Sequence, residues 1–436
     1  MKYFSFLKKI SVLLFFFFSL NILFAQNSDT LSSELFEWLQ TVPGIEIRQI
    51  EHDSIFVEAY EIMVAQPLDH KNPDRRKFKQ QIFLSHIDKS RPVVFDTEGY
   101  SAFNRTQELS RILNANQIVV EHRFFAESTP DTLDWQYLNI WQAAADHHRI
   151  VSIFKDFYTG KWINTGISKG GQTTMYHTRF YPGDVDASVP YVAPLNFALE
   201  DKRVYDFLDN VSTQACRSKV FNFQKLVLQK RNELLPLFIS SAEESSAAFP
   251  MGYDKAYEYV VLEYSFAYWQ WSDGDCAKIP DSNSTNEEIF NHLKIFSPFS
   301  YFTEQGIKAY EPFFYQAFTE LGYYGYETDK FGDLIKFVDG SNSVFAPEGV
   351  QTEFNPEVMQ DINNWIQNEG NNFIFIYGGN DPWSSTSVNL TGNTNSIKMV
   401  LPGGSHRTRI RNFPDADKEK IYSKLEEWLD IKIKRD

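Results

Sequence analysis

The chain has 436 residues and a formal net charge of −15, with 57 acidic and 42 basic side chains. This acidity argues against nucleic acid and against an anionic membrane as a stable partner. The length exceeds that of one ordinary domain, so we expect a core with a large insertion. The sequence contains no phosphate loop, zinc motif or dinucleotide fingerprint, and we therefore expect no cofactor and no metal. It does not predict an oligomeric state.

The N-terminus has the pattern of an export signal, which we assign to residues 1–25. Lys8 and Lys9 end a short basic region, and residues 10–24 form an apolar run that is too short for a typical membrane-spanning helix. Loss of this segment, which carries three lysines and no acid, would change the net charge from −15 to −18. We expect a secreted or periplasmic protein, with a retained N-terminal anchor as the alternative.

Two patterns of strands follow the signal. Apolar and polar residues alternate over residues 56–68 and 78–87, which predicts an antiparallel pair joined by a turn. Residues 92–95 and 117–120 are short continuous apolar runs, typical of strands buried on both faces of a sheet. Between these two runs, residues 103–113 have helical spacing, so strands and helices alternate from here on. Such alternation predicts a mostly parallel sheet.

A helix is predicted to run from Asp134, a favourable N-cap residue, to Phe157. The run Glu121-His122-Arg123 stands at the end of the strand before it. Either these three residues shape a binding pocket, or they form a buried ion pair or hydrogen-bond network that holds the helix. We favour the network. His147 and His148 lie in the middle of the helix, and we interpret them as structural.

The most informative segment is Gly166-Ile167-Ser168-Lys169-Gly170, which follows a strand-like run at 162–165. Residues 171–177 can open a helix, and a further strand is predicted at 187–192. A Ser between two glycines at a strand-to-helix turn is the nucleophile elbow of α/β-hydrolases. Glycine is needed on both sides because a Cβ atom would collide with the neighbouring strand and helix. The alternative is a Gly/Ser turn without chemistry. We predict that Ser168 is a nucleophile.

The pattern changes near residue 200, and from there to about 365 the chain is mainly helical, aromatic and irregular. We interpret residues 200–365 as a helical cap inserted between two parts of an α/β-hydrolase core, residues 26–199 and 366–436. Both cysteines, Cys216 and Cys276, lie in this insertion. In an exported protein we expect them to form one disulfide that closes a loop of about 60 residues, worth ~3–4 kcal/mol. Two free buried thiols are the alternative.

The rest of a catalytic triad is predicted near the C-terminus. A Ser hydroxyl needs a His to accept its proton, and that His needs a carboxylate to hold its tautomer. In α/β-hydrolases the chain order is Ser, acid, His, with the last two on loops after late strands. Asp381 follows a predicted strand at 373–377, and His406 follows another at 397–401. We therefore predict Asp381 as the orienting acid and His406 as the base.

An oxyanion hole needs two N–H groups that point to the developing negative charge. The backbone N–H of Lys169, directly after the nucleophile, is predicted to be one of them. The second is expected from the loop at 96–100, where Gly99 permits close approach. The sequence leaves open whether the N–H of Gly99 or that of Tyr100 is the donor.

The sequence resembles serine peptidase family S37, the secreted tripeptidyl aminopeptidases. The segments that carry this resemblance lie at 166–171, 176–186 and 191–194, whereas those at 121–125 and 142–146 also resemble the related lysosomal prolyl carboxypeptidase and dipeptidyl peptidase group. The resemblance extends from about residue 50 to the C-terminus. It implies an α/β-hydrolase fold and an exopeptidase that releases short peptides, typically tripeptides, from free N-termini. Position by position, it also supports the triad given above.

An aminopeptidase must bind a free α-ammonium group, and a buried ammonium needs a carboxylate partner. Glu98 lies on the predicted oxyanion loop, and Glu263 opens an aromatic segment at 263–271 that includes Trp269. We predict that one of the two acids binds the substrate amine and that Trp269 lines the cleft. The alternatives are a structural hydrogen bond for Glu98 and an ordinary helix carboxylate for Glu263.

Two other functions remain open on the sequence. An esterase or lipase uses the same fold, elbow and triad, so the fold cannot separate it from a peptidase. The motifs of family S37 and a cap rich in acids and aromatics favour peptides, whereas a lipase lid is more often short and apolar. The other alternative is a binding protein that kept the hydrolase fold without catalysis, and an intact triad argues against it.

Overall fold

The computed structural model describes residues 33–435, so the predicted export signal at 1–25 lies outside the described residues. The chain divides into two compact units, Met1–Thr41 and Val42–Asp436. The described part of the first unit contains one short helix, α1 (Glu34–Thr41). In the described residues no helix is both long and apolar enough to span a membrane.

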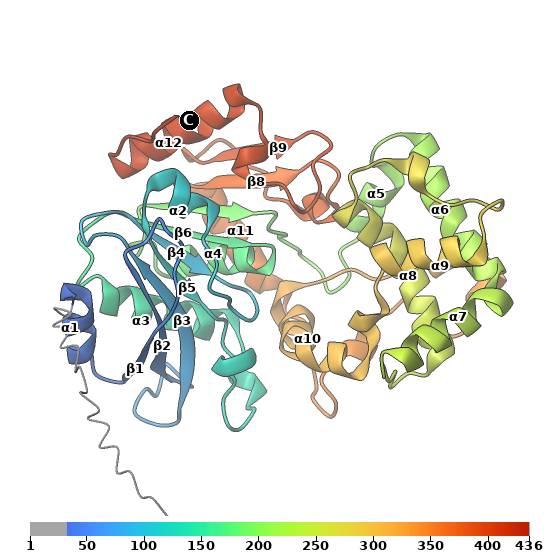
Figure 1. The fold of residues 1–436 in the computed structure, drawn as a ribbon, viewed down its shortest axis with the longest axis horizontal. Helices are drawn as coiled ribbons and strands as arrows, with labels where there is room; N and C mark the ends of the chain where they lie inside the picture. The colour runs from blue at the N-terminus through green and yellow to red at the C-terminus, as the bar shows by residue number, and fades with distance from the viewer. Residues whose placement is uncertain (1–32, 436) are drawn as a thin grey trace, which may run out of the picture. The chain divides into compact units, whose positions relative to one another are not determined.

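The second unit contains a nine-stranded sheet in the order β1-β2-β3-β5-β4-β6-β7-β8-β9 (Figure 1). The first three strands are antiparallel, and β2 pairs with β3 along its whole length, which confirms the predicted antiparallel pair. From β4 to β9 all neighbours are parallel. The sheet is therefore mostly parallel, as predicted. The strands are β1 (Ile45–Gln49), β2 (Glu58–Pro67), β3 (Lys77–His86), β4 (Val93–Thr97), β5 (Asn116–Val120), β6 (Trp162–Ile167), β7 (Ala187–Tyr191), β8 (Ile374–Gly378) and β9 (Ile397–Leu401).

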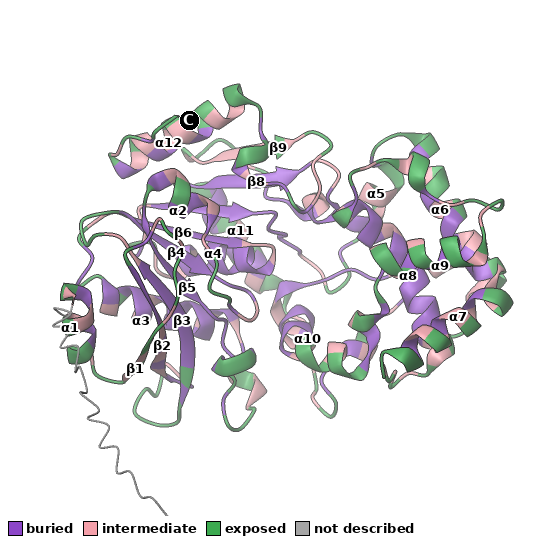
Figure 2. Cartoon of the chain, viewed as in Figure 1, coloured by how far each residue is buried: buried purple, intermediate pink, exposed green. Residues whose placement is uncertain are grey.

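Helices cover both faces of the parallel strands, which are buried along their length at the centre of the sheet (Figure 2). Alternate residues of β8 show the two faces: Ile374 and Ile376 pack with α2 and α12, whereas Phe375 and Tyr377 pack with α3, α4 and α11. Burial on both faces explains why these strands are continuous apolar runs. The covering helices are α2 (Glu108–Leu113), α3 (Ile140–Phe154), α4 (Lys169–Phe180), α11 (Pro356–Asn368) and α12 (Asp415–Leu429).

The start of the helix predicted from Asp134 is wrong. Asn139 is the N-cap of α3, and its side chain accepts a hydrogen bond from the N–H of Gln142. Asp134 instead precedes a short 3₁₀ turn, and its carboxylate binds Arg76 and Gln136. Asp and Asn are both favourable N-cap residues, so the sequence alone does not show whether Asp134 or Asn139 caps the helix. Tertiary contacts decide between them.

Between β7 and β8 the chain forms a helical insertion with an aromatic core. Its central helix, α8, is largely buried, and the same apolar cluster includes Phe125 and Trp383 from outside the insertion. Cys216 and Cys276 form a disulfide within it, which confirms the predicted pairing. The limits at 200 and 365 stay a prediction. The helices are α5 (Arg203–Asn210), α6 (Gln214–Gln229), α7 (Arg231–Glu244), α8 (Tyr253–Trp271), α9 (Asn286–Phe296) and α10 (Glu304–Gln316).

Candidate active site

Ser168 occupies a strained turn between β6 and α4. Its φ and ψ are 59° and −121°, a conformation that non-glycine residues rarely adopt and that is held here by the surrounding structure. The Ser168 N–H donates to the carbonyl of Tyr191 (2.9 Å), and its carbonyl accepts from the N–H of Gln172 (3.1 Å). A Cβ atom on Gly166 would lie 2.2 Å from the carbonyl oxygen of Gly170. The turn therefore has the close packing that a nucleophile elbow requires.

Asp381 and His406 form a buried pair on the loops after β8 and β9. Nδ1 of His406 lies 2.7 Å from Oδ2 of Asp381, and the other carboxylate oxygen accepts from the N–H of Trp383 (3.2 Å). The backbone N–H of His406 donates to the carbonyl of Gln270 in α8 (3.0 Å). The carboxylate thus fixes the imidazole ring, and the helical insertion fixes the loop that carries it.

Ser168, Asp381 and His406 all follow the carboxyl ends of parallel strands, β6, β8 and β9. Ser168 is partly exposed, and its hydroxyl forms no hydrogen bond with another residue of the range 33–435. Catalytic hydrogen bonds of this kind often shorten only when substrate binds. The structure contains the hydrogen bond between Asp381 and His406. Proton transfer from Ser168 to His406 is a proposal.

The predicted oxyanion loop packs against the first turn of α4. A Cβ atom on Gly99 would lie 2.6 Å from both the backbone nitrogen of Gly170 and the Cβ of Lys169, so only glycine fits. The Lys169 side chain is buried, and its Nζ donates to the carbonyl of Gly99 (2.6 Å). The sequence predicted a role for the backbone of Lys169 but none for its side chain, because no local pattern reveals a contact with a loop 70 residues earlier.

Glu263 lies in α8 with two phenol partners. The hydroxyls of Tyr324 and Tyr326 donate to its Oε2 at 2.9 and 2.8 Å. Burial raises the pKa of Glu263 to about 7, although both phenols act in the opposite direction. No Lys, Arg or His within 33–435 forms an ion pair with it. The Tyr324 ring stacks on Phe266 (4.0 Å between centroids) and contacts Trp383 (5.4 Å), which follows Asp381 by two positions.

Glu98 has a different environment from Glu263, although the sequence favours neither of them as the amine-binding acid. Its Oε1 accepts from the guanidinium of Arg105 at 2.7 Å. Burial raises the pKa of Glu98, and the Arg105 charge opposes that rise. Glu98 therefore already has a cationic partner, whereas Glu263 has only neutral ones.

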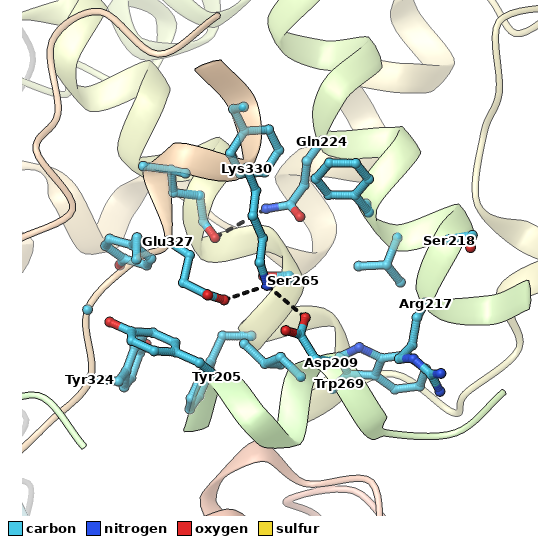
Figure 3. A pocket seen from close by; sticks show the side chains of 18 of the residues that line it. Tyr205, Asp209, Arg217, Ser218, Gln224, Ser265, Trp269, Tyr324, Glu327 and Lys330 are labelled. Atoms are coloured by element: carbon cyan, nitrogen blue, oxygen red, sulfur yellow. Dashed lines mark hydrogen bonds and ion pairs between the residues drawn. The ribbon is translucent and has the colours of Figure 1, made fainter. Parts of the chain in front are cut away.

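Trp269 is buried and lines a pocket of about 430 Å³ within the insertion (Figure 3). In this pocket the Lys330 ammonium lies between the carboxylates of Asp209 (2.7 Å) and Glu327 (2.6 Å). The pocket is bounded by α5, α6, α8 and the segment at 324–331. Neither the predicted triad nor Glu263 lines it.

The run after β5 forms a buried network, which confirms the favoured interpretation. The Arg123 guanidinium binds both carboxylate oxygens of Asp146 in α3 at 2.6 and 2.8 Å, and Glu121 accepts from the N–H groups of Ala102 and Ser128. His147 is fully buried, and burial lowers its pKa to about 3. A neutral imidazole in that position agrees with the predicted structural role.

The strand order, the strained Ser turn after β6 and the Asp–His pair after β8 and β9 define an α/β-hydrolase. Residues 32–434 match the family described as PS-10 peptidase S37, and the chain belongs to this family of serine peptidases. This confirms the resemblance seen in the sequence. A prolyl tri/tetrapeptidyl aminopeptidase from Streptomyces mobaraensis is 34% identical over 377 residues, which are 84% of this chain and 79% of that protein.

Two solved structures have low similarity to this chain. A proline iminopeptidase from Mycobacterium smegmatis has a TM-score of 0.44 and 12% identity, over 84% of this chain and 98% of that one. Acetyl xylan esterase 1 from Thermoanaerobacterium sp. has a TM-score of 0.36 and 12% identity, over 89% of each chain. Both TM-scores lie below 0.5, and the strand order, rather than these similarities, defines the fold.

Proposed function

We propose that this serine peptidase is an exported exopeptidase that releases short peptides, typically tripeptides, from substrates with free N-termini. The observation that carries the proposal is the hydrogen bond between Asp381 and His406 (2.7 Å), at the sheet edge where Ser168 occupies its strained turn. The name of the Streptomyces relative, a tri/tetrapeptidyl aminopeptidase, supports release of peptides of three or four residues.

In this mechanism the Ser168 hydroxyl attacks the carbonyl carbon of the scissile bond while Nε2 of His406 takes its proton. Asp381 stabilises the resulting imidazolium. His406 then protonates the leaving amine, and an acyl-enzyme on Ser168 remains. Water attacks the acyl-enzyme with His406 again as base, and the short peptide leaves. The N–H of Lys169 and one N–H of the Gly99–Tyr100 segment stabilise the oxyanion in both steps.

We assign recognition of the substrate amine to Glu263 rather than to Glu98. A carboxylate buried among phenols without a cation is held at a raised pKa, and a substrate ammonium would supply the missing charge. Glu98 is already neutralised by Arg105. Of the two tyrosines that bind Glu263, Tyr324 contacts Trp383 on the loop that carries Asp381. Trp269 stays a proposed cleft residue; it lines the same pocket as Tyr324 and Tyr326, whereas Glu263 does not line it.

The test is cleavage of one peptide library in two forms, with free and with acetylated N-termini, analysed by mass spectrometry. We expect rapid release of tripeptides from the free form and little cleavage of the acetylated form, with Ser168→Ala inactive on both. Rapid cleavage of acetylated peptides would overturn the exopeptidase assignment. Export is tested separately by N-terminal sequencing of the protein recovered outside the cytoplasm, which we expect to begin at Gln26.

A further inference from the structure

The Lys169 side chain has an unusual environment for a lysine. Only 2% of the residue is exposed, and Nζ donates to the Gly99 carbonyl at 2.6 Å. The ammonium lies over the rings of Tyr100 and Phe125, 5.5 and 5.1 Å from their centroids. No carboxylate in the described part of the chain pairs with it. Burial of an amine without a counter-charge is costly and lowers the pKa of Lys169 well below its ordinary value.

The hydrogen bond from Lys169 fixes one particular peptide group. The described residues include no cis peptide, so the Gly99 carbonyl and the Tyr100 N–H point in opposite directions from the same planar unit. Holding that carbonyl against Nζ therefore directs the Tyr100 N–H away from the lysine side chain. This N–H has no acceptor among residues 33–435. The Gly99 N–H belongs to the preceding peptide, whose direction this bond does not set.

The rest of the loop is anchored on both sides of this peptide. The Glu98 N–H donates to the carbonyl of Val120 (3.2 Å), and the Tyr100 carbonyl accepts from the N–H of His122 (3.0 Å). Val120 is the last residue of β5, a buried strand, and His122 follows it by two positions. Between the two anchors, the Gly99–Tyr100 peptide contacts the residue that follows the nucleophile.

We propose that Lys169 is a positioning residue of the oxyanion hole: its Nζ holds the Gly99 carbonyl so that the N–H of Tyr100 is the second donor, beside the N–H of Lys169 itself. The inference rests on the proposed serine mechanism and resolves the choice between Gly99 and Tyr100 that the sequence leaves open. An amine that donates to the carbonyl also polarises the peptide, which strengthens its N–H as a donor. Both effects require the donor group and not merely the volume of the side chain.

The proposal has a specific kinetic consequence. The oxyanion exists in the transition state and not in the bound substrate, so loss of its positioning lowers kcat and leaves KM nearly unchanged. Removal of one oxyanion donor typically lowers kcat by about 10²–10³-fold. For Lys169→Met, which keeps a long unbranched side chain but lacks the terminal donor, we expect a loss at the lower end of this range, about 100-fold.

The experiment compares Lys169→Met with Lys398→Met, which removes a half-buried lysine of β9 whose Nζ donates to Ser387 and Asn389. Measured quantities are kcat, KM, the thermal midpoint, and the inhibition constant of a tripeptide aldehyde, whose adduct with Ser168 carries an oxyanion. We expect kcat and aldehyde affinity to fall together in Lys169→Met, with KM within threefold, and no change in Lys398→Met. A folded Lys169→Met enzyme with kcat within twofold of the native value would overturn the inference, as would a change in KM alone.

Lys169→Gln provides a second test in case the methionine variant does not fold. Its amide keeps a donor on a shorter chain, so we expect an intermediate loss of kcat with a matching loss of aldehyde affinity. A loss of kcat with native aldehyde affinity would overturn the inference. Ser168→Ala tests the serine mechanism separately from the role of Lys169. If Ser168→Ala still hydrolyses peptides, the proposed function fails. If Ser168→Ala is inactive and Lys169→Met is fully active, only the role of Lys169 is refuted.

Discussion

Glu263→Gln is the most informative perturbation of substrate recognition. Glutamine has nearly the same shape and still accepts hydrogen bonds from Tyr324 and Tyr326, but it cannot neutralise an ammonium. Two opposite charges about 4 Å apart attract by roughly 4 kcal/mol at the effective dielectric of a partly buried site. Desolvation of the ammonium reduces the gain, and we expect about 2–4 kcal/mol. This corresponds to an increase in KM of about 30- to 1,000-fold for substrates with a free N-terminus.

The pH dependence of KM follows from the pKa of Glu263, which burial raises from its ordinary value of 4.5 to about 7. Only the ionised carboxylate attracts the ammonium, so KM should rise as the pH falls below 7, by up to about tenfold for each pH unit. The substrate α-amino group loses its proton near pH ~8, so KM should also rise on the alkaline side. In Glu263→Gln the acid side of this profile should become flat.

The same substitution should stabilise the fold. A carboxyl group whose pKa is raised on folding binds its proton more tightly in the folded state, so its ionisation destabilises the protein above pH ~7 and not below pH ~4. The difference between 4.5 and about 7 corresponds to about 3 kcal/mol, an upper bound because Glu263 is partly exposed. Urea unfolding at pH 8 and pH 4 measures the effect. We expect Glu263→Gln to gain stability at pH 8 only.

The assay uses matched tripeptidyl substrates with free and acetylated N-termini, and Glu98→Gln is the control. Glu98 is paired with Arg105, so its substitution should affect both substrates alike. Equal losses on both substrates in Glu263→Gln would show that this residue is part of the scaffold. A variant less stable than the native protein at pH 8 would refute the argument from burial.

Three further predictions test the orienting acid, the disulfide and the buried ion pair. Asp381→Asn should keep the fold and lower kcat by about 10⁴-fold, because the imidazole loses its orienting charge; native turnover by a folded variant would exclude Asp381 as the acid. Replacing Cys216 and Cys276 by Ser opens a loop with a sequence separation of 60 and should lower the free energy of unfolding by about 4 kcal/mol in urea titrations; equal midpoints would contradict this. Arg123→Met leaves Asp146 buried without its guanidinium and should cost about 3–5 kcal/mol; a thermal midpoint near the native value would show that the pair is dispensable.

The sequence predicts those features whose cause is local. The central parallel strands are recognisable because burial on both faces makes most of their residues apolar, and Ser168 is recognisable because its turn requires glycine on both sides. Strand β1 is missing from the sequence-based prediction because it is largely exposed and its alternation of apolar and polar residues extends over only four positions, Ile45 to Arg48. The partners of Glu263 were not predicted either, because Tyr324 and Tyr326 come from 61 and 63 residues later in the chain. Such contacts depend on how the helices of the insertion pack, which no short pattern encodes.

Helix α8 offers a physical account of why three residues would be released. Glu263 and Gln270, whose carbonyl holds the His406 loop, are seven positions apart and so lie on one face, about 10 Å apart along the axis. Three extended residues also span about 10 Å. Ala267 lies one turn closer to Gln270, so moving the carboxylate there, in Glu263→Gln/Ala267→Glu, should shorten the released peptide by one or two residues.

Mass spectrometry of the products from one decapeptide measures this change, and Glu263→Gln/Ala267→Gln controls for the loss of charge and the added volume. The control should cleave slowly and without preference for a length. Continued release of tripeptides by the carboxylate-shifted variant, at the rate of Glu263→Gln alone, would show that α8 does not set the length. In that case the amine would have to be recognised by a group outside this helix, and the assignment of Glu263 would fail with it.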